Sequence, residues 1–447
     1  MIKNYRGKKV AVVGLARSGA AVSRLLRDLG SQVYVTDSAD NDRLRLLAED
    51  LKRRGIYLET GGHSLDFIRN KDLVVSSPGV SNKSQALLWA DELKIPVVSE
   101  IELSWSLCPA TVIAITGTNG KTTVTTLLGK VLGTTGWPPS LRRGDSRSHR
   151  PPRLRRGDSR SHRRVWTLGN IGKPFAQEVM NMHSDDFVSL EVSSFQLERI
   201  IAFKPKVSVI LNFTRDHLDR YGDMPEYLAA KKRIFMNQSR DDYLVLNYDQ
   251  PILRGLAKES KAKVIFFNAR RATQDAPHLN PNHYAVMAVA KIFGISEARC
   301  MEVFRNFKGV EHRLEQVRTI NGIEFINDSK ATNVDSTVWA LQGMHKPTIL
   351  IAGGRDKNSD YRLISDLIKQ KVKLLMLIGE AREKIRTAFK GLLSIEEASS
   401  LEEATQKSFK RAHGGDCVLL SPMCASFDMF EDYEQRGRVF KEIVNKL

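Results

Sequence analysis

The chain has 447 residues, of which 42% are hydrophobic and 27% are charged. This composition is typical of a globular protein with about three domains, at roughly 150 residues each. It excludes a membrane-spanning protein, because no apolar run approaches the roughly 18 residues that a transmembrane helix needs. The N-terminal residues lack the apolar segment of a signal peptide, and the four cysteines are scattered without metal-ligand spacing. We therefore expect a cytoplasmic protein with free thiols.

The net charge of +18 is unevenly distributed, because residues 137–164 hold ten arginines and two aspartates and so supply +8 of it. Within this stretch, Leu141–Arg150 recurs letter for letter as Leu154–Arg163. High charge and few apolar residues predict a disordered insert. We interpret it as an in-frame duplication in a permissive loop, and the alternative is a basic arm that binds RNA or another anionic surface. The remaining charge fits an enzyme for anionic substrates, so we expect no nucleic-acid partner.

Residues 8–13 predict a buried strand, followed by the glycine-containing turn 14–19 and a helix. A second strand, 32–36, ends at Asp37, as in the nucleotide-binding half of a Rossmann-like fold. We interpret this domain as a nucleotide or nucleotide-sugar site. The alternative, NAD binding, is disfavoured because Ala16 stands where the second glycine of G-x-G-x-x-G lets the backbone approach a pyrophosphate.

The apolar strand 111–114 leads into the glycine turn 115–123, and the leucines that follow are spaced as on one face of a helix. A strand, a glycine turn and a helix N-terminus form a phosphate-binding cradle. We expect Lys121 to reach the outer phosphates of a nucleotide and the Thr122 hydroxyl to hold a magnesium ion. The spacing Gly-x-x-Gly-Lys-Thr is tighter than in the general phosphate loop, which has glycine where this chain has Ile115.

Two later strands of the same domain end in residues that could bind a metal ion. The strand 186–190 ends at Glu191, and a carboxylate at a strand end in the sheet of a phosphate loop is where a magnesium ligand is expected. The strand 207–211 leads to His217, which two aspartates flank. We place His217 near the metal, and the alternative is a structural histidine.

A hairpin with the turn Asn321-Gly322 opens the last part of the chain. Three further strands follow, each ending in Gly, Ser or charged residues and each followed by helical sequence. The segments together predict an α/β protein with three domains. These are a Rossmann-like N-terminal domain (1–99), a central P-loop ATPase-like α/β domain (100–309) and a C-terminal Rossmann-like α/β domain (310–447).

Several motifs in this order resemble those of the Mur ligases, whose tight phosphate loop is also similar to that of the folylpolyglutamate ligases. They are ITGTNGKTT at 115–123, GNIGKP at 169–174, LEVSSFQLE at 190–198 and DHLDRY at 216–221. Two more resemble the branch of the family that adds D-glutamate, and they are INDSKATN at 326–333 and LLSPMCASFDMFEDYEQRG at 419–437. The resemblance covers all three domains apart from 137–164 and about 268–290.

The resemblance implies an ATP-driven, amide-forming ligase of peptidoglycan precursor synthesis that works through an acyl phosphate. It implies the substrates ATP, UDP-N-acetylmuramoyl-L-alanine and D-glutamate, together with two magnesium ions, and we expect a monomer. It also implies that Lys231 is carbamylated by CO2 and so becomes a carboxylate-like ligand of the metal site. The neighbouring Lys232 is an alternative, and a solvated basic helix face is the plain structural explanation of both lysines.

The resemblance assigns roles to individual positions. Catalytic residues would be Lys121, His217, Lys231 and Lys330. ATP would be bound by Gly117, Thr118, Asn119, Gly120, Lys121, Thr122, Thr123, Asn282, Arg313 and Asp328. The UDP substrate would be bound by Arg17, Ser18, Asp37, Ser38, Ser77, Asn170 and Ser193. D-Glutamate would be bound by Lys330, Thr332, Lys357, Ser426 and Phe427, and metal ions by Thr122, Glu191, His217 and Lys231.

Two departures from the family pattern bear on activity. Family members have a His-Asn-x-x-Asn stretch before the third domain, and residues 277–284 differ from it, so Asn282 is the best candidate for the adenine-side asparagine. Leu168 stands where a glycine is usual. A folded but inactive ligase is therefore the alternative to an active one.

Overall fold

The computed structural model describes residues 4–134, 163–170, 172–268 and 279–447. Almost all of the predicted basic repeat lies outside these ranges, and so do the first residues of the stretch 277–284. Among the described helices, none combines the length and the apolar character needed to cross a membrane.

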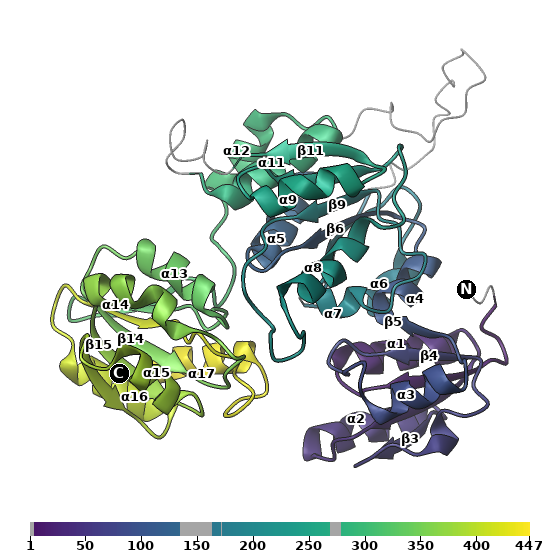
Figure 1. Ribbon diagram of the computed structural model, residues 1–447, viewed down its shortest axis with the longest axis horizontal. Helices are drawn as coiled ribbons and strands as arrows, with labels where there is room; N and C mark the ends of the chain where they lie inside the picture. The colour runs from purple at the N-terminus through teal and green to yellow at the C-terminus, as the bar shows by residue number, and fades with distance from the viewer. Residues whose placement is uncertain (1–3, 135–162, 171, 269–278) are drawn as a thin grey trace. The chain divides into compact units, whose positions relative to one another are not determined.

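The described residues contain three sheets (Figure 1) and form two compact units. The first unit comprises residues 1–212 and 229–307, and the second comprises 213–228 and 308–447. The loop 213–228 follows a strand of the middle sheet in the chain, yet it packs with the second unit.

The first sheet consists of five strands, which are β1 (Lys9–Val13), β2 (Gln32–Asp37), β3 (Tyr57–Thr60), β4 (Leu73–Ser76) and β5 (Val97–Ser99). The helical segments between them are α1 (Arg17–Asp28), α2 (Asp42–Arg53), η1 (Leu65–Phe67) and α3 (Gln85–Glu92). All strand pairs are parallel, in the order β3-β2-β1-β4-β5. The four valines and alanines of β1 after Lys9 are all buried, as is typical of a strand that is covered on both faces.

The turn between β1 and α1 depends on close packing around two glycines. Gly14 adopts φ +94°, which favours glycine, and a Cβ at Gly19 would lie 1.9 Å from the Gly14 carbonyl O. The hydroxyl of Ser77, just after β4, donates to the same carbonyl O at 2.7 Å. The start of α1 therefore sits directly against the turn, in the arrangement predicted for a Rossmann-like domain.

The middle sheet consists of β6 (Thr111–Thr116), β7 (Val165–Gly169), β8 (Phe187–Glu191), β9 (Val207–Ile210), β10 (Tyr243–Asn247) and β11 (Lys263–Phe267). Its longer helices are α4 (Glu100–Leu107), α5 (Lys121–Gly133), α8 (Met224–Lys232), α11 (Pro281–Ile292) and α12 (Glu297–Arg305). Shorter segments are α6 (Phe175–Glu178), η3 (Val179–Asn181), α7 (Ser194–Leu197), η4 (Arg233–Phe235), α9 (Pro251–Leu256) and η5 (Ala257–Glu259). The strands are all parallel, in the order β11-β10-β9-β6-β8-β7.

One face of the middle sheet packs on α5, α11 and α12. Ile113 and Ile115 of β6 and Val207 and Val209 of β9 belong to the same buried cluster as the apolar residues of these helices. The strand residues are two apart, so their side chains leave the sheet on one face. The helix after the phosphate loop is therefore anchored by the strand that precedes the loop.

The third sheet consists of β12 (Glu315–Ile320), β13 (Ile323–Asn327), β14 (Thr348–Gly353), β15 (Val372–Ile378), β16 (Ser394–Glu397) and β17 (Cys417–Leu420). Its helical segments are α13 (Val334–Gln342), η6 (Tyr361–Ile364), α14 (Ser365–Lys371), α15 (Arg382–Phe389), α16 (Leu401–Arg411) and α17 (Tyr433–Lys446). The order is β12-β13-β17-β14-β15-β16, and only the hairpin pair β12–β13 is antiparallel among the described strand pairs. The predicted turn is confirmed, with φ +51° at Asn321 and +78° at Gly322.

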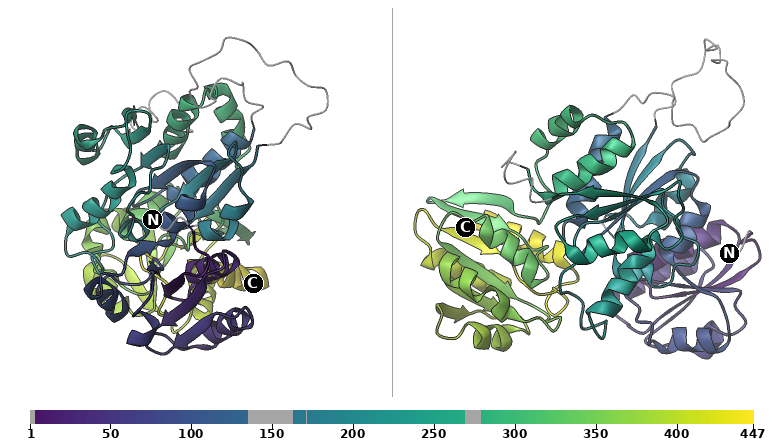
Figure 2. Two further views of the ribbon diagram at one scale, coloured as in Figure 1. Left: turned by 90° about the vertical axis from the view of Figure 1, so that its right-hand side faces the viewer. Right: turned by 45° about the horizontal axis from the view of Figure 1, so that its top comes forward.

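Helices cover both faces of the third sheet. Figure 2 shows the ribbon in two further views. Leu350 and Leu419 pack into a cluster with residues of α13, α14 and α15. Their strand neighbours Ile349 and Val418 pack into a second cluster with residues of α16 and α17. Alternate strand residues thus point to opposite faces, which confirms the predicted doubly wound arrangement.

The close packing at Gly19 leads to a test of the first domain. We expect Gly19→Ala to lower the local opening free energy of this domain by roughly 2–4 kcal/mol, because the new Cβ collides with a backbone carbonyl. Hydrogen–deuterium exchange of peptides from residues 8–99 measures this loss. Gly79→Ala is the control, since a Cβ there would meet nothing within 4 Å. Equal exchange in the two variants would contradict the packing argument.

Candidate functional site

The loop between β6 and α5 contains two glycines in conformations that other residues rarely adopt. Gly117 has φ +154° and Gly120 has φ +81°. A Cβ at Gly120 would lie 2.4 Å from Oδ1 of Asn282, and one at Gly117 would lie 3.0 Å from Cβ of Leu211. Only glycine therefore fits at these two places. The first turn of α5 begins at Lys121 and directs backbone N–H groups toward this loop, as in phosphate-binding sites.

The two predicted phosphate and magnesium ligands of the loop lie in the first turn of α5. The Nζ of Lys121 donates to the carbonyl O of Gly117 at 2.9 Å and to that of Thr118 at 2.8 Å. Its ammonium group therefore lies over the loop where it is predicted to bind the outer phosphates of a nucleotide. Thr122 follows directly and is 6% exposed.

Two asparagines from other elements support the loop. Asn212, just after β9, accepts a hydrogen bond from the N–H of Asn119 at 2.8 Å and donates to its carbonyl O at 3.0 Å. Asn282, in the first turn of α11 and the candidate for the adenine-side asparagine, lies beside Gly120. Asn212 was not predicted as a site residue, although its position after a predicted strand is the signal that could have identified it.

Glu191 ends β8 and pairs with Ile115 of β6, so the carboxylate lies at the same sheet edge as the loop. It is 2% exposed, and its Oε1 accepts a hydrogen bond from Nδ2 of Asn170 at 3.0 Å. Within the described ranges its Oε2 is buried and has no hydrogen-bond partner. A buried carboxylate oxygen without a partner is costly, and a magnesium ion would satisfy it. The residues present therefore fit the implied nucleotide and ion.

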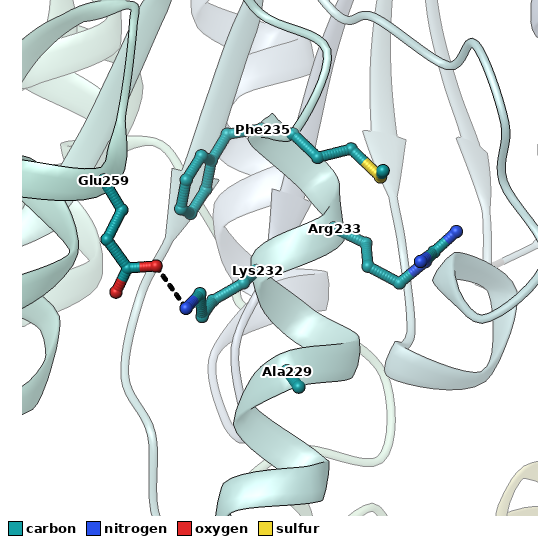
Figure 3. A pocket seen from close by; sticks show the side chains of 6 residues that line it. Ala229, Lys232, Arg233, Phe235 and Glu259 are labelled. Carbon is teal, nitrogen blue, oxygen red and sulfur yellow. Dashed lines mark ion pairs between the residues drawn. The ribbon is translucent and has the colours of Figure 1, made fainter.

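The two adjacent lysines of α8 have different surroundings. Lys231 is 1% exposed, and its Nζ donates to the carbonyl O of Gly117 at 3.0 Å. The ammonium group of Lys232 instead pairs with Glu259 (Figure 3). That ion pair lies at a surface pocket, whose lining residues are Ala229, Lys232, Arg233, Phe235, Met236 and Glu259. The structure thus brings Lys231 rather than Lys232 to the phosphate loop.

His217 belongs to the second unit, where the neighbouring Asp216 anchors its loop. Asp216 is 8% exposed, and its Oδ1 accepts a hydrogen bond from the N–H of His217 at 2.9 Å. Its Oδ2 accepts from Nδ2 of Asn333 at 2.9 Å, and Lys357 lies 3.4 Å from Oδ1. The predicted D-glutamate ligand Lys357 and the predicted metal ligand His217 are therefore brought together through one carboxylate. Asn333 was quoted in a motif but was not assigned a role.

Asp328, predicted to contact ATP, directly follows β13 and is fully buried. The hydroxyl of Ser421 donates to its Oδ2 at 2.9 Å, and Nη1 of Arg313 lies 3.4 Å from its Oδ1. Burial raises the pKa of the Asp328 carboxyl to about 6, and Arg313 and the Ser421 hydrogen bond oppose this rise. The two predicted ATP residues of the second unit therefore form one ion pair.

The other predicted D-glutamate residues lie on two loops of the second unit. The Nζ of Lys330 lies 2.5 Å from the hydroxyl O of Tyr433 and 4.1 Å from the centre of its ring. Ser426 is buried, whereas Phe427 is 62% exposed. The backbone N–H of Thr332 donates to the carbonyl O of Lys330. Tyr433 was missed by the sequence reasoning, since only its place in a long motif marked it.

The predicted UDP-substrate residues lie in two parts of the first unit. Asp37 ends β2, and its Oδ2 accepts a hydrogen bond from the Leu15 N–H at 2.6 Å, so it also holds the glycine turn. Ser77 contacts the same turn, as described above, while Arg17 and Ser18 begin α1 and Ser38 is exposed. Asn170 and Ser193 belong to the middle sheet, where Asn170 donates to Glu191 and Ser193 caps the N-terminus of α7.

Family models match almost the whole chain. The model of the MurD-like N-terminal domain matches residues 8–99, that of the Mur ligase middle domain matches 115–309, and that of the glutamate ligase domain matches 312–424. The model that matches the first domain is therefore a Mur ligase model, which gives no support to the NAD alternative.

Curated relatives match over their full length. A protein of Thermoanaerobacter sp. (strain X514) is 38% identical, with 99% of each chain covered. One of Caldicellulosiruptor bescii is 40% identical, again with 99% of each chain covered. Both are named UDP-N-acetylmuramoylalanine–D-glutamate ligase.

Solved structures show the same fold at low sequence identity. UDP-N-acetylmuramate-alanine ligase MurC from Thermotoga maritima has a TM-score of 0.58 at 19% identity, covering 98% of this chain and 99% of that one. The MurF ligase of the same organism in complex with ADP has a TM-score of 0.56 at 13% identity, covering all of both chains. With three matching domain models in order and full-length relatives well above 30% identity, this chain belongs to the Mur ligase family.

Proposed function

We propose that this protein is an ATP-dependent ligase that joins D-glutamate to UDP-N-acetylmuramoyl-L-alanine in peptidoglycan precursor synthesis. The observation that carries the proposal is the arrangement at the edge of the middle sheet, where the phosphate loop lies next to the buried carboxylate of Glu191 with one oxygen open to a cation. The names of the full-length relatives supply the substrate pair. We expect the enzyme to act as a cytoplasmic monomer.

The proposed reaction has two steps. The L-alanine carboxylate attacks the γ-phosphorus of ATP, the bond to the ADP oxygen breaks, and an acyl phosphate forms. The amine of D-glutamate then attacks the acyl carbon and loses a proton, and the bond to phosphate breaks to leave the amide and inorganic phosphate. Both steps bring anions together, so catalysis needs charge neutralisation and positioning more than covalent help from the protein.

Each unit supplies part of this chemistry. In the first unit, Lys121 would neutralise charge on the ATP phosphates, and Asn282, beside Gly120, would bind the adenine side of the nucleotide. Thr122, Glu191 and a carbamylated Lys231 would hold magnesium, which supplies further positive charge when bound, and His217 stays a predicted ligand. In the second unit, Lys330 and Lys357 match the two carboxylates of D-glutamate, with Thr332, Ser426 and Phe427 beside them.

The ligase proposal predicts strict dependence on both acceptor and amino acid. Phosphate release should require UDP-N-acetylmuramoyl-L-alanine and D-glutamate together, and Lys121→Ala should lower it by roughly a hundredfold or more, because a preorganised charge on the phosphates is lost. Lys130→Ala, an exposed lysine of the same helix, is the matched control and should keep full activity. Release that continues unchanged without D-glutamate would refute the proposal.

The environments of the two α8 lysines predict which one is carbamylated. Carbamylation joins the lysine nitrogen to CO2 and releases a proton. We expect a carbamate carbon resonance in protein equilibrated with ¹³C-bicarbonate, because Lys231 is sequestered next to the Gly117 carbonyl. The resonance should vanish in Lys231→Arg and persist in Lys232→Arg. The opposite pattern would move the modification to Lys232.

The environment of Asp328 predicts a pH effect. Ser421→Ala removes a donor that stabilises the ionised carboxylate, so the pKa of Asp328 should rise further above about 6. The charged form is then reached only at higher pH, and kcat/KM for ATP should fall roughly threefold or more below wild type at pH 6 while approaching it at pH 8. Ser408→Ala, a buried serine of α16, is the control. Superimposable pH profiles for wild type and Ser421→Ala would exclude this role.

A further inference from the structure

The connection between α7 and β9 is fixed to the middle sheet's part of the first unit by two side chains. Glu102 of α4 is fully buried, and its carboxylate accepts hydrogen bonds from the three backbone N–H groups of residues 201–203, at 2.9, 2.8 and 2.8 Å. Arg233 of η4 donates from Nε to the carbonyl O of Leu197 at 2.7 Å and from Nη2 to that of Ile200 at 2.5 Å. The backbone on either side of residues 198 and 199 is therefore held in place.

Arg199 lies in this connection, and its contacts lead to elements of the first sheet. Its carbonyl O accepts a hydrogen bond from the N–H of Ser99, the last residue of β5, at 2.9 Å. Its guanidinium donates to both carboxylate oxygens of Asp91 in α3, at 3.0 and 2.8 Å. Two parallel hydrogen bonds of this kind fix the orientation of the two groups as well as their distance. Arg199 therefore ties the connection to two elements of the first domain.

Asn82, in the turn between β4 and α3, completes this set of contacts. Its Oδ1 accepts a hydrogen bond from Nε of Arg199 at 2.8 Å, and its Nδ2 donates to Oε2 of Glu198 at 2.7 Å. The acceptor and the donor of one amide thus meet matching groups on two successive residues. We call the four residues Asn82, Asp91, Glu198 and Arg199 the domain latch.

The domain latch lies a few residues from both parts of the predicted UDP-substrate site. The turn that carries Asn82 begins at Ser77, whose hydroxyl donates to the carbonyl O of Gly14. On the other side, Ser193 caps the N-terminus of the short helix α7, and Glu198 directly follows that helix. One short segment therefore joins the latch to each part of the predicted site.

We propose that the domain latch is a positioning device that sets the distance between the UDP part and the muramoyl-L-alanine part of the substrate site. This inference rests on the proposed function, in which the first domain holds the UDP part and Asn170 and Ser193 hold the muramoyl-L-alanine part. In this role the latch residues contact no substrate themselves. A ligand that spans two sites binds most tightly when the sites are held at the spacing that it bridges. The latch therefore acts on the affinity for the whole substrate and leaves the affinity for UDP alone unchanged.

The exposure of the latch separates this role from a contribution to stability. The side chains of Arg199 and Asp91 are 23% and 47% exposed, and ion pairs with such exposure add little to the free energy of unfolding. A comparable pair lies wholly within the first domain, where Arg24 of α1 donates through Nε and Nη2 to Oδ2 of Asp50 in α2, at 3.1 and 2.8 Å. That pair has no contact with the connection between α7 and β9, so its loss should not alter the spacing of the two parts.

Arg199→Ala tests the inference in the full-length protein. We expect the Kd of UDP-N-acetylmuramoyl-L-alanine, measured by calorimetry, to rise roughly fivefold or more, because the two parts of the site are no longer held at one spacing. The Kd of UDP and the KM for ATP should stay within about twofold of the wild-type values, since neither ligand reaches across the latch.

Arg24→Ala is the matched control, because it removes an arginine–aspartate pair of similar exposure from the same unit. It should lower the melting temperature about as much as Arg199→Ala while leaving the Kd of the full substrate within about twofold of wild type. An equal rise of that Kd in both variants, or a parallel rise of the UDP Kd in Arg199→Ala, would show a general structural effect and overturn the inference.

Asp91→Ala provides a second route if Arg199→Ala folds poorly, since it removes only one partner of the guanidinium. It should raise the Kd of the full substrate about twofold or more, and the double variant should bind no more weakly than Arg199→Ala alone, because both substitutions act through one contact. Wild-type affinity for the full substrate in both single variants would refute the latch. Failure of the wild-type protein to bind that substrate would instead refute the proposed function.

Discussion

The parallel pairing of β6 with β8 on one side and β9 on the other is the constraint on which the candidate site depends. Parallel strands end at the same edge of a sheet. The loop after β6, Glu191 at the end of β8 and Asn212 just after β9 therefore lie close together at that edge. The packing of α5 against one face of the same strands then fixes where Lys121 begins its helix. A shift of one residue between these strands would turn Glu191 to the other face and separate it from the loop.

Buried carboxylates of the first unit differ in how far the protein itself satisfies them. Glu102 receives three backbone hydrogen bonds, whereas Glu191 receives one from Asn170 and keeps a second oxygen without a partner among the described residues. The three backbone donors make Glu102 a structural anchor, whereas the unpartnered oxygen of Glu191, at the sheet edge beside the phosphate loop, is suited to a cation. The same comparison separates Lys232, which pairs with Glu259, from Lys231, which faces the phosphate loop.

Sequence reasoning predicted the features that are local in the chain and missed those that arise from packing. Strand ends and the glycine loop are encoded within a few residues, and the structure places them as expected. The strands β3, β7 and β16 were missed because all three are short edge strands without a continuous buried apolar run. Tyr433 beside Lys330 and Glu100 beside Ala176 could not be predicted, since each contact joins distant segments and neither residue type signals it.

The second unit shows why contacts of this kind matter for function. Asp216 accepts hydrogen bonds from the backbone of His217 and from Asn333 and pairs with Lys357, so one carboxylate orders a predicted metal ligand and a predicted D-glutamate ligand together. Because Asp216 is almost completely buried, losing any one partner leaves charge or hydrogen-bonding capacity uncompensated at the others. Residues assigned separately to metal and to amino acid are therefore energetically coupled, and their substitutions should not act independently. The coupling follows from the loop 213–228 packing with the third sheet rather than with the sheet from which it emerges.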